Sequence, residues 1–104
     1  MHYLLMYELA DNYLERRGEF RDAHLKLAWE AQERGEIIVA GALADPFDMA
    51  VLMFQGESAE VAEKFAKADP YVSAGLVTAY KVRQWNTVVG AQANAPMHPA
   101  KGGK

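Results

Sequence analysis

Two side chains in this 104-residue sequence have types and positions suited to acid–base chemistry, His24 and Asp69. His24 lies within an apolar arc of a predicted helix, whereas His2 starts the chain and His98 lies in a proline-rich tail. A carboxylate within hydrogen-bonding distance of a histidine makes it a general base, because it fixes the imidazole tautomer and stabilises the imidazolium. A simpler interpretation is that His24 is a buried histidine whose ring donates to a backbone carbonyl.

Asp69 stands at the end of the second predicted helix, directly before Pro70. The C-terminal end of a helix dipole is negative, so a carboxylate there is disfavoured by about 0.3–1 kcal/mol. This placement favours a functional role, although an Asp before a proline also commonly initiates a turn. Arg21, one turn before His24, suits a substrate carboxylate, an acidic side chain of the protein or bulk solvent. Tyr71 suits a hydrogen bond to a ligand oxygen or the wall of a pocket.

Composition excludes several other classes of function. Eleven Lys and Arg residues against fourteen Asp and Glu leave a formal charge of −3, which offers no electrostatic footprint for nucleic acid. The lack of cysteine excludes disulfides, thiolate nucleophiles and cysteine-based metal sites. No uncharged apolar run approaches the roughly 18–20 residues of a membrane helix, and the start of the chain lacks the pattern of a signal peptide. We therefore expect a cytoplasmic protein without a nucleic-acid or membrane partner, a metal or a cofactor.

The elements that must position these residues follow from local patterns. Four short aliphatic or aromatic segments bounded by turn residues are predicted strands: 2–9, 36–43, 49–55 and 76–85. Apolar residues at helical spacing predict a helix over 20–34, with an irregular start after Asn12 because Gly18 weakens it. A second helix is predicted over 58–68. The order β-α-β-β-α-β is the ferredoxin-like unit of the α+β class, a four-stranded antiparallel sheet with both helices on one face.

The other face of this sheet needs a cover. The first three predicted strands are apolar at nearly every position, so an open face would expose an apolar patch on the order of several hundred square ångströms. We therefore expect a homodimer, or a higher oligomer, whose sheets pack face to face and enclose a pocket for a small molecule. The aromatic residues and methionines of the strands are expected in the core or around that pocket: Tyr3, Met6, Tyr7, Met53 and Phe54.

Two features fall outside the predicted core. After Gly90 the chain holds Ala, Gln, Asn, Pro, Gly and Lys without periodicity. We therefore expect one domain over 1–88 and a flexible tail over 89–104, unless the tail docks on a partner. Trp29 projects away from the apolar arc of the first helix, and a large aromatic residue on a charged face is typical of an interface.

Three runs of sequence together resemble the YciI-like (YCII-related) family of small dimeric α+β barrel proteins: RDAHL at 21–25, GEIIVAGAL at 35–43 and ADPYVSAGLV at 68–77. The similarity covers about residues 2–88. The motifs R-x-x-H-L and D-P-Y/F-x-x-A-G are fairly specific in combination. The resemblance implies a ferredoxin-like fold that dimerises through its sheets, with the catalytic His and Asp of the family falling on His24 and Asp69.

These observations predict a cofactor-independent enzyme of the lyase, isomerase or dehydrohalogenase type, acting on a small cyclic or aromatic-like carbonyl compound. His24 would be the general base and Asp69 its partner, while Arg21 and Tyr71 would bind the substrate. Two alternatives stay open. A protein of the same fold could bind a small ligand without turnover, or it could be an accessory subunit that contacts another protein through Trp29 or the tail.

Overall fold

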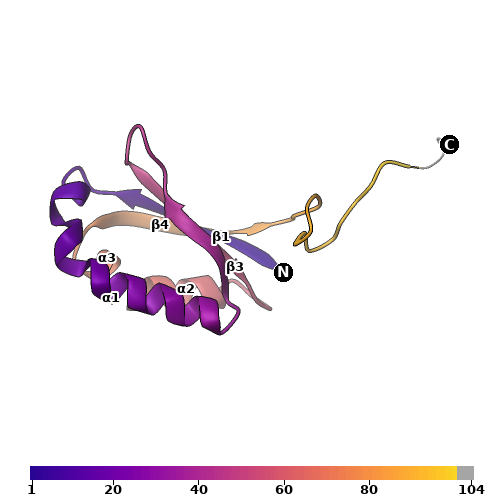
Figure 1. Ribbon diagram of the computed structural model, residues 1–104, viewed down its shortest axis with the longest axis horizontal. Coiled ribbons are helices and arrows are strands. Elements are labelled where there is room, and N and C mark those ends of the chain that lie inside the picture. The colour runs from indigo at the N-terminus through magenta and orange to yellow at the C-terminus, as the bar shows by residue number, and fades with distance from the viewer. Residues whose placement is uncertain (101–104) are drawn as a thin grey trace.

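The computed structural model describes residues 1–100, and its strands and helices follow one another as Figure 1 shows. The strands are β1 (His2–Leu9), β2 (Ile37–Ala42), β3 (Met49–Gln55) and β4 (Val77–Trp85). The helices are α1 (Tyr13–Glu33), α2 (Glu60–Ala68) and the short α3 (Pro70–Ser73). The four strands form one antiparallel sheet in the order β2-β3-β1-β4. The predicted α+β fold with β-α-β-β-α-β order is confirmed, and α3 is an element that the local patterns did not predict.

Helix α1 begins at Tyr13 and runs through Gly18 without a break, so the predicted irregular start is wrong. A glycine costs about 1 kcal/mol in a helix interior, and tertiary contacts of the first turns offset that cost. The buried ring of Tyr13 meets the ring of Tyr71 edge-on, with centroids 5.8 Å apart. The guanidinium of Arg16 donates to the backbone carbonyl that follows α3.

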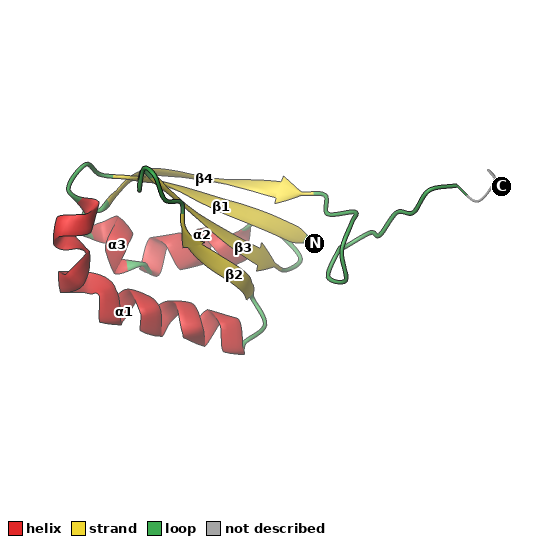
Figure 2. Ribbon diagram, turned by 45° about the horizontal axis from the view of Figure 1, so that its top comes forward, coloured by secondary structure: helices red, strands yellow, loops and turns green. Residues whose placement is uncertain are grey.

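The core lies between the helices and one face of the sheet (Figure 2). β1 is an inner strand, so its alternate side chains that face the helices are covered on all sides. They are Tyr3, Leu5, Tyr7 and Leu9. Of the strand residues expected in the core, Tyr3, Tyr7 and Phe54 are buried there. Met6 and Met53 instead lie on the opposite face of the sheet and are half-buried.

That opposite face of the sheet has no described helix over it (Figure 2). The strand register places apolar side chains of β1, β2 and β3 there: Leu4, Met6, Val39, Val51 and Met53. β4 contributes Lys81 and Arg83 to the same face, beside Trp85. We call this surface the open face. It is apolar along three strands, as the sequence predicts, and positively charged along the fourth.

The chain beyond β4 leaves the sheet and extends away from it (Figure 1). The first part of this segment folds back through hydrogen bonds within the segment, since the amide of Ala95 donates to the carbonyl of Thr87. The domain over 1–88 and the tail over 89–104 stay predictions, and residues 101–104 lie outside the described part of the chain. Within that described part, no helix is long and apolar enough to span a membrane.

Candidate active site

His24 and Asp69 are in direct contact. His24 comes from the middle of α1, and Asp69 lies at the junction of α2 and α3. Nδ1 of His24 lies 2.8 Å from Oδ1 of Asp69. Because an ionised carboxylate only accepts hydrogen bonds, Nδ1 carries the proton and Nε2 holds a lone pair. The pair therefore has the arrangement of a general base and its orienting acid.

Asp69 is completely buried, and three groups donate to its carboxylate. Besides His24, the phenol of Tyr7 on β1 donates to Oδ2 at 2.7 Å, and the backbone amide of Tyr71 donates to Oδ1 at 3.0 Å. The amide contact makes Asp69 the N-cap of α3. The sequence had placed this carboxylate only at the unfavourable C-terminal end of α2, whereas the structure places it at the favourable start of α3 as well. A buried carboxylate costs several kcal/mol unless its oxygens are paired, and these donors supply the pairing.

The ring of His24 is held between two aromatic side chains and reaches the surface on its remaining side. Tyr71 stacks on the imidazole in parallel, with centroids 3.8 Å apart, and Phe65 meets it edge-on at 6.4 Å. The His24 side chain is 16% exposed. Every fully buried side-chain nitrogen or oxygen of the described residues has a hydrogen-bond partner. Nε2 of His24 has no partner among these residues, so it is not one of the fully buried atoms. Nε2 is therefore accessible to a ligand.

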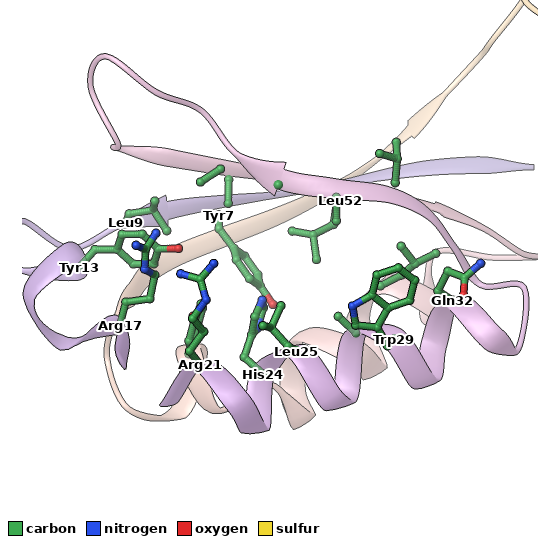
Figure 3. A pocket seen from close by; sticks show the side chains of 18 of the residues that line it. Tyr7, Leu9, Tyr13, Arg17, Arg21, His24, Leu25, Trp29, Gln32 and Leu52 are labelled. Atoms are coloured by element: carbon green, nitrogen blue, oxygen red, sulfur yellow. The ribbon is translucent and has the colours of Figure 1, made fainter. Parts of the chain in front are cut away.

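A cavity of about 500 Å³ lies between α1 and the sheet, and His24 forms part of its wall (Figure 3). The helix contributes mostly polar or aromatic side chains to this cavity, with one leucine among them: Arg17, Arg21, His24, Leu25, Trp29 and Gln32. The strands contribute a mostly apolar wall that includes Tyr7, Leu9 and Leu52. The sequence predicted a pocket between the sheets of two copies, whereas this cavity lies on the helix side of the sheet. The cavity is open to solvent in part, since Leu25 on its wall is 38% exposed.

Arg21 and Tyr71, the expected substrate contacts, both line this cavity. Arg21 is exposed and forms no ion pair with an acidic side chain of the described residues. Burial raises the pKa of the Tyr71 phenol to about 12. The hydroxyl therefore stays protonated at neutral pH and is able to donate to a ligand oxygen.

Three further side chains belong to the site, although the sequence analysis did not assign them to it. Tyr7 was expected in the core or around a pocket, without a role toward Asp69; it donates to the Asp69 carboxylate, and burial raises the pKa of its phenol far above the usual range. Arg17 lines the cavity one turn before Arg21, and this i,i+4 spacing was a signal that could have found it. Trp29 lines the cavity as well, while its side chain is 62% exposed, so it lies outside the apolar core as the sequence predicted but beside the site.

The other two histidines lie away from the cavity. His2 is buried at the end of β1, where its ring is hydrogen-bonded to the hydroxyl of Thr87. His98 is exposed in the segment after β4. Residues 1–100 contain no group of three or more His, Cys, Asp or Glu side chains placed to hold a metal ion. His24 is therefore the histidine on which chemistry in this cavity would depend.

Comparison with known protein sequences identifies a family. A model of the YCII-related domain matches residues 1–86. Protein YciI of Escherichia coli O6:H1 (strain CFT073) is 30% identical over 97 residues, which cover 85% of this chain and 99% of that protein. The protein of the same name from Shigella flexneri matches to the same extent. The matched region contains both His24 and Asp69.

Comparison with solved structures supports the same fold. The 5-chloro-2-hydroxyhydroquinone dehydrochlorinase TftG from Burkholderia phenoliruptrix AC1100, solved in complex with 2,5-dihydroxybenzoquinone, superposes with a TM-score of 0.70. The two proteins are 23% identical, and the match covers 84% of this chain and 95% of TftG. At that identity the similarity establishes the fold alone.

Proposed function

The chain belongs to the YCII-related domain family, and from this premise we propose that it is a cofactor-independent enzyme of the lyase, isomerase or dehydrohalogenase type. Its substrate is a small cyclic or aromatic-like carbonyl compound. His24 is the general base and Asp69 orients it. The observation on which the proposal depends is the 2.8 Å contact between Nδ1 of His24 and Oδ1 of Asp69, which directs the lone pair of Nε2 toward the cavity.

The proposed reaction moves protons and needs no oxidant or reductant. Nε2 of His24 accepts a proton from an acidic C–H or O–H group, and the released electron pair forms a carbon–carbon or carbon–oxygen double bond. Either a leaving group such as chloride then departs with its bonding electrons, or the proton returns to another atom of the substrate. Asp69 stabilises the imidazolium in between, while Arg21 and Tyr71 stabilise negative charge on a substrate oxygen.

The similarity to TftG supports this class of substrate. TftG is a dehydrochlorinase, and its bound 2,5-dihydroxybenzoquinone is a planar ring with two carbonyl groups. A ring of this kind is small enough for a cavity of about 500 Å³. Its carbonyl oxygens are suitable acceptors for the guanidinium of Arg21 and the phenol of Tyr71.

A homodimer formed through the open face is part of the proposal. Leu4, Met6 and Met53 lie there without a helix over them, and Val39 is 64% exposed. Packing of two such faces would remove both sets of apolar side chains from water. The cavity lies on the other side of the sheet, so each copy would keep its own His24 accessible.

The test is turnover of 5-chloro-2-hydroxyhydroquinone, followed by chloride release, together with proton–deuterium exchange of cyclic ketones in heavy water. We expect turnover by the native protein and a fall of about 10²–10⁴-fold for His24→Ala. Lys26→Ala, a change on an exposed part of the same helix, is the matched control and should be as active as the native protein. Equal rates for His24→Ala and the native protein would overturn the assignment. Binding of these compounds without chloride release or exchange would identify a ligand-binding protein instead of an enzyme.

A further inference from the structure

Arg17 and Arg21 bring two positive charges to one end of the cavity. They stand one turn apart on α1, and both side chains point from the helix toward the strands (Figure 3). The ion pairs of the described residues involve His24, Lys26 and Arg34, so neither cavity arginine is neutralised by an acidic side chain among them. In a chain with a formal charge of −3, two such arginines on one wall indicate an anionic ligand.

The surroundings of the two arginines keep their charges near the reacting group. The Arg17 guanidinium lies 5.7 Å from the centroid of the Tyr13 ring, which is itself buried. Both arginines also act on Tyr71, because their charges oppose the rise in its pKa that burial causes. Tyr71 in turn stacks on His24. The positive charges and the proposed base therefore face the same part of the cavity.

The far end of the cavity is mostly apolar, since Ala28, Trp29 and Ile37 line it together with one polar side chain, Gln32 (Figure 3). Since an α-helix rises 1.5 Å per residue, Arg17 and Trp29 are separated by about 18 Å along α1. A single six-membered ring does not span this distance. His24 lies between the two ends, about 4.5 Å along the helix axis from Arg21. The cavity thus has a cationic end, a base near that end and an apolar extension.

We propose that Arg17 and Arg21 form a carboxylate subsite, and that the ligand is an amphipathic carboxylic acid whose apolar part extends toward Trp29. Guanidinium groups suit this role because their paired N–H donors match the two oxygens of a carboxylate. The inference rests on the proposed function only in calling this acid the substrate. His24 then acts on an atom a few bonds from the carboxylate.

The experiment measures binding by calorimetry and needs no turnover. The probes are 4-butylbenzoate, the neutral 4-butylbenzamide and the shorter benzoate. We expect the native protein to bind 4-butylbenzoate about 10–100-fold more tightly than the amide, the effect of hydrogen bonds to a charged group. Arg17→Gln and Arg21→Gln should each remove most of this preference while leaving amide binding unchanged. Lys26→Gln removes one charge from the same helix outside the cavity and should bind like the native protein.

The apolar end is tested with the same probes. Trp29→Ala should reduce the advantage of 4-butylbenzoate over benzoate without changing the preference for acid over amide. Equal affinity for acid and amide, unchanged acid binding in both arginine variants, or no saturable binding of any probe would overturn the carboxylate subsite. If the native protein shows no turnover but the charge preference is present and is lost in the arginine variants, the proposed function fails and the subsite stands.

Discussion

The imidazole of His24 and the phenol ring of Tyr71 are stacked, with centroids 3.8 Å apart and planes inclined by 3°. Tyr71 follows Asp69 by two residues, and the Asp69 carboxylate accepts the Nδ1 proton of the same imidazole. The start of α3 therefore holds His24 in two ways, through a carboxylate at its edge and an aromatic ring over its face. The junction between α2 and α3 orients the proposed base, although that base belongs to α1.

Asp69→Asn should weaken the proposed base by removing the negative charge beside it. The new amide oxygen is still able to accept from Nδ1 and from the backbone amide of Tyr71, with the amide nitrogen toward the Tyr7 hydroxyl. A neutral amide stabilises the imidazolium less than a carboxylate does. We expect kcat/KM to fall about 10²–10⁴-fold, with the fold retained in circular dichroism. Asp22→Asn, on an exposed part of α1, is the matched control. Activity of Asp69→Asn equal to that of the control would contradict the role of the Asp69 charge in stabilising the imidazolium.

Tyr7→Phe should lower stability by leaving Oδ2 of Asp69 without its donor. An unpaired buried acceptor costs about 1–3 kcal/mol, which denaturant unfolding measures directly. Tyr80→Phe is the control, because the Tyr80 ring lies 6.3 Å from that of Tyr7 but is 38% exposed. Equal losses in the two variants would show that the hydrogen bond to Asp69 contributes no stability of its own.

Stability should decrease at alkaline pH because Tyr7 and Tyr71 ionise late in the native state. Burial is the largest cause that raises both pKa values, to about 12 for Tyr71 and higher for Tyr7. Above about pH 10 the unfolded chain loses phenolic protons that the native state keeps. Stability is therefore complete below about pH 10 and falls above it, by up to about 1.4 kcal/mol per pH unit for Tyr7.

Denaturant unfolding across this alkaline range checks the prediction, with tyrosinate absorbance recorded in parallel. Tyr7→Phe should reduce the slope of stability against pH, since it removes one of the late-ionising groups. A native protein whose tyrosines all ionise near about pH 10, with stability unchanged up to that point and beyond, would contradict it.

Light scattering should give a native mass about twice the chain mass of 11.5 kDa. Met6→Glu and Val51→Glu, at facing register positions on the open face, should shift the protein to monomers because a charge there would be buried in the dimer. Leu14→Glu, at a half-exposed position of α1, should leave the dimer intact. A well-folded native monomer at micromolar concentration would rule out the dimer.

Truncation after Gly90 should leave the thermal midpoint and the oligomeric state unchanged. The hydrogen bonds of the removed segment mostly close on itself or on the residues just before it, such as Ala95 to Thr87 and Met97 to Val88. Thr87 keeps its contact with His2 in the truncated chain. A fall of several degrees in the melting midpoint would show that the segment is a packed arm.

Local sequence pattern was sufficient for the sheet and most of the helices. The strands expected over 2–9 and 49–55 coincide with β1 and β3. The strand expected over 36–43 is one residue longer than β2 at each end, and that over 76–85 begins one residue before β4. Short apolar runs, helical spacing and turn residues are properties of short segments, so they are readable without the fold. α3 was missed because its single turn depends on the Asp69 cap, a contact that a proline signal alone does not reveal.

By itself, the sequence determined the element order and singled out His24 and Asp69 by type, position and motif. The tertiary structure decided their 2.8 Å contact, the hydrogen bond from Tyr7 and the place of the cavity on the helix side of the sheet. Spacing along a helix or strand specifies which side chains share a face. It does not specify what that face meets, because Tyr7, His24 and Asp69 come from elements far apart in the chain and meet only when those elements pack.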